Sequence, residues 1–150
     1  MAKQARTTTS KAIMWLVASV AVLFGLMTIK SGGQVLFGDE SYRVAAGNYV
    51  PFVLWFNFMA GFAYLVVGIG IAAQKSWTVG LALLIAISTL LVFAAFGLHL
   101  FAEGAYEIRT VGAMTLRSMV WVVIAIILYR HFKAGAIPAE LRDADTGHSS

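Results

Sequence analysis

Ionisable side chains concentrate in one stretch of this chain, residues 99–117, which reads HLFAEGAYEIRTVGAMTLR. Only 12% of the whole chain is charged, so the clustering stands out against its surroundings. The group comprises His99, Glu103, Tyr106, Glu107, Arg109 and Arg117. Side chains of these types can pair with one another, bind a small polar ligand or hold a metal ion.

Two interpretations of this group involve no metal. In the first, Glu103 or Glu107 neutralises Arg117, and the resulting network only fixes two helices to each other. In the second, the group forms a pocket for a small ligand such as a quinone headgroup. Arg117 would then donate to an oxygen of the ligand, with His99 or Tyr106 assisting.

A third interpretation is a metal site, in a membrane enzyme or a metal transporter, with His99, Glu103 and Glu107 as ligands. Zinc and iron both accept imidazole and carboxylate ligands. The set is sparse, because it has one histidine, and the two nearby arginines oppose cation binding. The sequence assigns no cofactor and no catalytic residue, and it leaves open whether the protein is an enzyme.

The composition defines the class of protein. The chain has 150 residues, of which 60% are hydrophobic, and a mean hydropathy of +0.82. Soluble domains are about 45–50% apolar and about 25% charged. These values predict an integral membrane protein. Cysteine is absent, which excludes disulfides and thiolate chemistry from the protein's own side chains.

Four segments are long and apolar enough to cross a membrane, since about 20 apolar residues in a helix span roughly 30 Å. They cover residues 12–30, 49–73, 77–102 and 110–130. Spanning segments without alternating polarity must be helical. The predicted fold is therefore all-α: one antiparallel four-helix bundle over residues 12–133. The tails, 1–11 and 134–150, are polar and are expected to be disordered.

The positions of lysine and arginine predict both tails in the cytoplasm, because cytoplasmic loops are enriched in these residues. Seven then lie inside and three outside, with Arg117 in the membrane. The inner set is Lys3, Arg6, Lys11, Lys75, Arg130, Lys133 and Arg142, and the outer set is Lys30, Arg43 and Arg109. We expect a multi-pass protein of a bacterial inner membrane. The net charge of +4 reflects this orientation and not nucleic-acid binding.

The position of Arg117 is the main anomaly. It follows Arg109 by eight residues, or about 12 Å along a helix. An isolated arginine at the centre of a membrane helix costs about 2.5–3.5 kcal/mol on insertion scales, so Arg117 must point inward and find a partner. His99 and Glu103 share one face near the outer end of the third span. We expect them to gather there with Arg117, and His99 to be its neighbour.

Small and polar residues share one face of the second span. Gly61 and Gly68 predict that another helix packs closely against this face. Asn57 lies on the same face and serves either in a hydrogen bond between helices or in a ligand site. The first outer loop, residues 31–48, is long for a connection between helices. We expect it to contain a short interfacial or re-entrant segment.

Two stretches carry a family resemblance, GLMTIKSGGQVLFG at the end of the first span and NFMAGFAYLVVGIGI in the second. Over roughly residues 13–100 the chain resembles the DoxX-like group of small four-helix membrane proteins. Lys30 and the glycines Gly61, Gly68 and Gly70 match the pattern of that group, whereas Asn57 stands where it often has a carboxylate. The resemblance implies a four-helix bundle associated with quinone-linked or oxidative-stress membrane systems.

The leading functional hypothesis is an accessory or small-ligand-binding membrane protein, with a quinone as the ligand that the resemblance suggests. The expected ligand-binding residues are Asn57, His99, Glu103, Tyr106, Glu107 and Arg117. The alternatives are the metal site and a purely structural subunit of a larger complex. Expected partners are the lipid bilayer and either a membrane redox complex or further copies of the chain.

Overall fold

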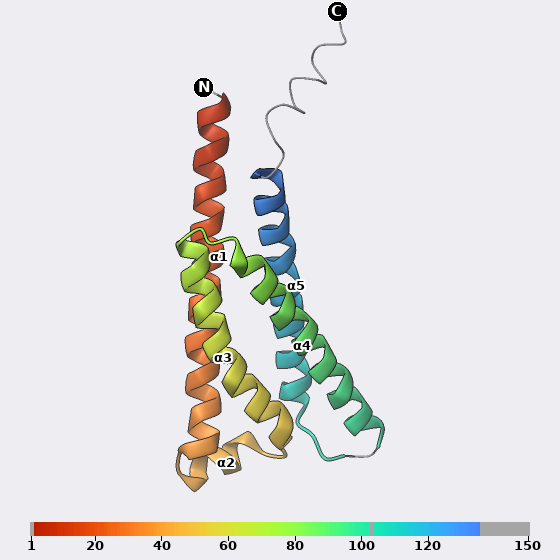
Figure 1. Ribbon diagram of the computed structural model, residues 1–150. Coiled ribbons are helices and arrows are strands. Elements are labelled where there is room, and N and C mark those ends of the chain that lie inside the picture. Colours follow the sequence, from red (N-terminus) through yellow and green to blue (C-terminus); the bar gives the residue numbers. More distant parts are fainter. Residues whose placement is uncertain (1, 103, 136–150) are drawn as a thin grey trace, which may run out of the picture.

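The computed structural model describes residues 2–102 and 104–135, and within them the regular structure is entirely helical (Figure 1). The five helices are α1 (Ala2–Phe37), α2 (Glu40–Ala46), α3 (Pro51–Ala72), α4 (Trp77–Phe101) and α5 (Ile108–Gly135). The start of α1 and the end of α5 lie at one end of the molecule. The short helix α2 and the start of α5 lie at the other end, which we call the α2 end.

Four helices are long and apolar enough to cross a membrane, as the sequence predicted. These segments are Ser10–Phe37, Pro51–Ala72, Trp77–Phe101 and Ile108–Lys133, and each contains an 18-residue stretch with a mean hydropathy of 1.9 to 2.6. Their outer surfaces carry many exposed large apolar side chains, among them Leu16, Ile69, Leu91 and Leu98. Exposed apolar surface on this scale is unfavourable in water and suits contact with lipid.

Helix α1 is longer than the first predicted span at both ends. Residues 2–11, which we expected to form a disordered tail, belong to the helix. Extending an existing helix needs no new nucleus, so a short polar stretch can continue it. At its other end α1 reaches Phe37, and the expected outer loop therefore contains the last turns of α1 followed by α2. Of the predicted tail 134–150, residues 136–150 lie outside the described part of the chain.

Helices α1 and α3 approach each other closely because glycines face each other along their contact. A Cβ added at Gly25 would lie 2.9 Å from the carbonyl oxygen of Gly61. One added at Gly68 would lie 3.1 Å from the backbone nitrogen of Val22. Neither position has room for a side chain unless a helix moves. This confirms the prediction that Gly61 and Gly68 face a neighbouring helix.

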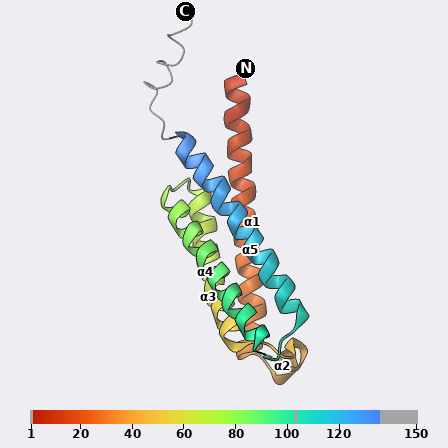
Figure 2. The same cartoon turned by 90° about the vertical axis from the view of Figure 1, so that its right-hand side faces the viewer.

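The main core lies where α1, α3, α4 and α5 meet. Its largest fully buried side chains include Tyr64 of α3 and Trp121 of α5, whose ring centroids are 4.5 Å apart. Ser10 Oγ of α1 and His131 Nδ1 of α5 lie 3.1 Å apart near the opposite end from α2, and Figure 2 shows α5 running obliquely to α1. A second, smaller core near the α2 end contains Val50, Val53, Phe96 and Met114.

The contact between α1 and α3 predicts opposite effects for two glycine-to-alanine substitutions. Gly25→Ala forces the helices apart, which typically costs about 1–3 kcal/mol and outweighs the roughly 0.5–1 kcal/mol that alanine adds to a helix. A Cβ added at Gly80 in α4 has no atom within 4 Å. Gly80→Ala should therefore stabilise the protein by the amount that alanine adds to a helix. The midpoint of thermal unfolding in one detergent should fall for the first variant and rise for the second. Equal midpoints would contradict this packing.

Candidate functional site

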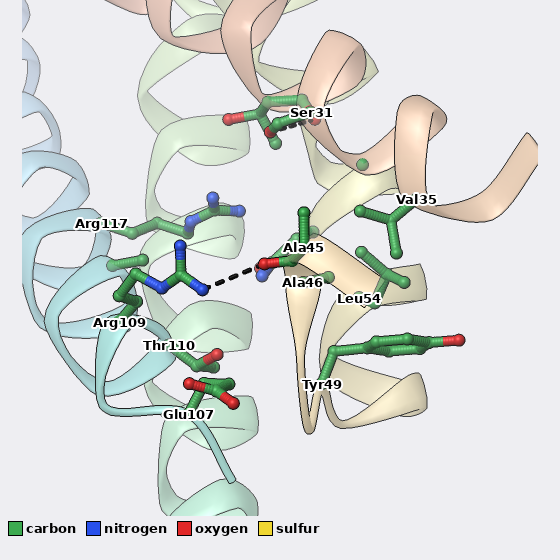
Figure 3. Close-up of a pocket in the computed structure, with 14 residues that line it drawn as sticks. Ser31, Val35, Ala45, Ala46, Tyr49, Leu54, Glu107, Arg109, Thr110 and Arg117 are labelled. Carbon is green, nitrogen blue, oxygen red and sulfur yellow. Dashed lines mark hydrogen bonds between the residues drawn. The ribbon is translucent and has the colours of Figure 1, made fainter. Parts of the chain in front are cut away.

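A cavity of about 320 Å³ lies near the α2 end of the molecule (Figure 3). It is bounded by the last turns of α1, the end of α2 with the residues after it, the first turns of α3 and the first turns of α5. The polar side chains in its lining are Thr28, Ser31, Tyr49, Asn57, Glu107, Arg109, Thr110 and Arg117. Val35, Leu54 and Ala113 contribute apolar surface. The cavity therefore combines a few polar groups with an apolar wall, as small-ligand sites do.

Arg117 is the most deeply placed charge in this lining. It is 7% exposed, and its Nε and Nη1 atoms are buried with no hydrogen-bond partner in the described part of the chain. Its Cζ atom lies 5.7 Å from the ring centroid of Phe24 and 5.8 Å from that of Tyr64. Aromatic faces attract a guanidinium through their quadrupoles. The neighbours of this cation thus include two rings, one from α1 and one from α3, and the hydroxyl of Tyr64 lies close to it as well.

Arg109 and Glu107 connect the start of α5 to the backbone around α2. Nη2 of Arg109 donates a hydrogen bond to the carbonyl oxygen of Ala45, at 3.0 Å (Figure 3). Oε1 of Glu107 accepts one from the backbone N–H of Asn48, at 3.1 Å. Between them, Gly47 has a φ of +67° and no side chain, so the carboxylate can approach it closely. Main-chain groups therefore hold both charged side chains.

Asn57 places an amide on the cavity wall from α3. Its Oδ1 atom is buried, and no described residue donates a hydrogen bond to it. The Tyr64 hydroxyl and Trp121 Nε1 are also buried without a hydrogen-bond partner among residues 2–102 and 104–135. Buried polar atoms are normally paired, and each exception calls for an explanation such as a bound ligand. Asn57 and Arg117 offer such groups at the cavity itself.

The structure brings together some of the residues that the sequence singled out. Asn57, Glu107 and Arg117 line one cavity. His99 lies outside the cavity lining, with its ring packed edge-on against Phe52 at 6.4 Å between centroids.

Tyr106, a further predicted site residue, is also separate from the cavity. Its ring packs edge-on against Phe96, with 6.5 Å between the centroids. Glu103 lies outside the described residues, so its expected pairing with Arg117 stays a prediction. Within the described chain no group of three histidine, aspartate or glutamate side chains is placed to hold a metal. The proposed metal set includes Glu103 and likewise stays a hypothesis.

Three important residues of α1 were missed in the sequence. Phe24 packs on Arg117, and Thr28 and Ser31 line the cavity. Their spacing of four and three residues places them on one helical face. This helical spacing was the sequence signal that could have identified them. It is a weak signal, because hydroxyl and aromatic residues are common in membrane helices.

No family model matches the chain, and comparisons with curated proteins and with solved structures also give no match.

The Tyr64 hydroxyl, which has no hydrogen-bond partner within the described part of the chain, gives a prediction about what this side chain contributes. Tyr64→Phe keeps the ring beside Arg117 and removes a buried polar atom whose desolvation costs about 1–3 kcal/mol. Its unfolding midpoint should equal or exceed that of the original protein. Tyr64→Leu removes the ring and leaves space in the core, so it should lose about 2–4 kcal/mol. Thermal unfolding of both purified variants tests this, and a strongly destabilised Tyr64→Phe would show that the hydroxyl is paired.

Proposed function

We propose that this chain is a multi-pass protein of a bacterial inner membrane, folded as an antiparallel four-helix bundle with both termini in the cytoplasm. The excess of lysine and arginine near the ends and in the α3–α4 turn supports this orientation. The α2 end would then face the outside, with the cavity just below the outer membrane surface.

Within this arrangement, the protein acts as an accessory protein that binds the headgroup of a small membrane-soluble ligand. The observation that carries this proposal is Arg117, a buried cation on the cavity wall whose described neighbours are aromatic rings. An ionisable residue inside a membrane span is costly and is typical of a functional site. A quinone headgroup is the candidate that the DoxX-like resemblance suggests, because its carbonyl oxygens accept hydrogen bonds from a guanidinium.

A structural subunit is the second candidate function. The observation that favours it is a pair of hydrogen bonds with the backbone around α2, one donated by Arg109 and one accepted by Glu107. These bonds stabilise the local structure without any ligand. For a purely structural subunit, the protein should co-purify with a larger complex, and replacing Arg117 should impair the assembly of that complex.

The proposed orientation can be tested by labelling, because the chain has no cysteine of its own. Ser41→Cys in α2 and Ser76→Cys in the α3–α4 turn place single exposed thiols at opposite ends of the molecule. In intact spheroplasts a membrane-impermeant maleimide should label the Ser41→Cys protein and spare the Ser76→Cys protein until the cells are lysed. The reverse pattern would place both termini outside.

Ligand binding can be tested with a quinone analogue of short chain length. Decylubiquinone should quench the tryptophan fluorescence of the purified protein saturably, because Trp121 packs on Tyr64 beside Arg117. Arg117→Gln should weaken this binding at least tenfold. Arg43→Gln, an exposed arginine of α2 outside the cavity lining, should not change it. If no quinone analogue or other amphiphile binds or shifts the unfolding midpoint, the ligand-binding proposal fails.

A further inference from the structure

We propose that the cavity selects a ligand with an anionic headgroup, a carboxylate or a phosphate, in preference to a neutral one. This inference rests on the proposed ligand-binding function and specifies the chemistry of the ligand. Such an anion reaches the site either as the headgroup of a membrane amphiphile or as a free ion from the outer solution.

The charges of the lining give the first argument. Two guanidinium groups, those of Arg109 and Arg117, share the cavity wall with one carboxylate, that of Glu107. One oxygen of this carboxylate already accepts the N–H of Asn48. No ion pair within 4.0 Å links these groups in the described residues. The site therefore carries a net positive charge, which favours an anion over a neutral molecule.

The surroundings of Arg117 give the second argument. Phe24 and Tyr64 attract its guanidinium but bring no negative charge. A quinone carbonyl would accept a hydrogen bond and leave this charge uncompensated. A carboxylate or phosphate would accept hydrogen bonds and compensate the charge as well, and the planar guanidinium matches both oxyanions in shape.

The remaining polar groups and the size of the cavity agree with an oxyanion. Thr28 and Thr110 contribute hydroxyl-bearing side chains to its lining, and hydroxyls can donate to oxyanions, whereas the Ser31 hydroxyl already donates to the carbonyl oxygen of Thr28 at 3.4 Å. Figure 3 shows the guanidinium groups of Arg117 and Arg109 extending from α5 toward α1 and the end of α2. The volume of about 320 Å³ holds a phosphate or carboxylate group together with several waters.

The test compares three ligands that share a ten-carbon chain: decyl phosphate, decanol and decylubiquinone. The full-length protein is placed in phosphatidylcholine nanodiscs, in a buffer free of phosphate and carboxylate ions. Binding is followed by tryptophan fluorescence and by the shift in unfolding midpoint. Decyl phosphate should bind at least tenfold more tightly than either neutral ligand. Equal affinities would overturn the inference while leaving the proposed function intact, whereas no binding by any ligand would overturn both.

Matched variants assign the preference to the cavity. Arg117→Gln should abolish it, and Arg43→Gln should retain it. Because Arg117→Gln replaces a buried residue and can impair folding, Arg109→Gln provides a second variant at an exposed position. It should reduce the preference for decyl phosphate about threefold or more. A preference that survives both cavity substitutions would place anion binding elsewhere and overturn the inference.

Two further measurements identify the source of the anion and test whether a carboxylate of the chain itself occupies the site. If inorganic phosphate competes with decyl phosphate at millimolar concentration, the natural ligand is a free anion. If it does not compete, the ligand is an amphiphile. Both results support the inference, provided that the tenfold preference for decyl phosphate holds.

Glu103→Gln addresses the carboxylate that lies outside the described residues. If anion binding appears only in the Glu103→Gln protein, the chain's own carboxylate occupies the site, and the inference fails.

Discussion

The burial of one positive charge constrains the rest of this structure. Arg117 lies about 13 Å into α5, and it reaches two aromatic rings that belong to different helices. Phe24 and Tyr64 can flank the guanidinium together only if α1 and α3 lie close to each other. The facing glycines Gly25 and Gly61 allow this approach. The core tryptophan of α5, Trp121, packs on the Tyr64 ring and fixes α5 against the pair.

At the α2 end, the charged side chains lie beside loops, and the backbone groups of these loops have no hydrogen-bond partners within a helix. The N–H of Asn48 and the carbonyl of Ala45 lie at the end of a short helix and after it, where such groups are left over. Glu107 and Arg109 satisfy them. At the α2 end, charged side chains thus contact main-chain groups, whereas deeper in the bundle the charge of Arg117 contacts aromatic rings. The cavity lies between these two environments and contacts both.

Much of the fold could be predicted from hydropathy, because the length and polarity of membrane helices are set by the bilayer. The second and third spans were placed to within two residues at each end, and the predicted fourth span began two residues late and ended five residues before the end of α5. The extension of α1 and the presence of α2 as a helix depend on local propagation and on contacts, which hydropathy does not report. The candidate site was harder to predict from the sequence than the fold. Arg117 was recognisable because charge is rare in a span, but its ring neighbours depend on how three helices pack. His99, expected beside it, instead packs on Phe52.

The energetics of Arg117 help to separate a structural role from a binding role. Insertion of an arginine costs about 2.5–3.5 kcal/mol at the centre of a span, and two aromatic neighbours return about 0.5–2 kcal/mol each. These contributions nearly cancel, so Arg117 adds little net stability, whereas an apolar side chain of similar size would carry no insertion cost. A contribution to net stability therefore does not by itself account for an arginine at this position. What arginine adds, and an apolar residue cannot, is a fixed positive charge on a cavity that contains hydroxyl groups and an unpaired amide oxygen.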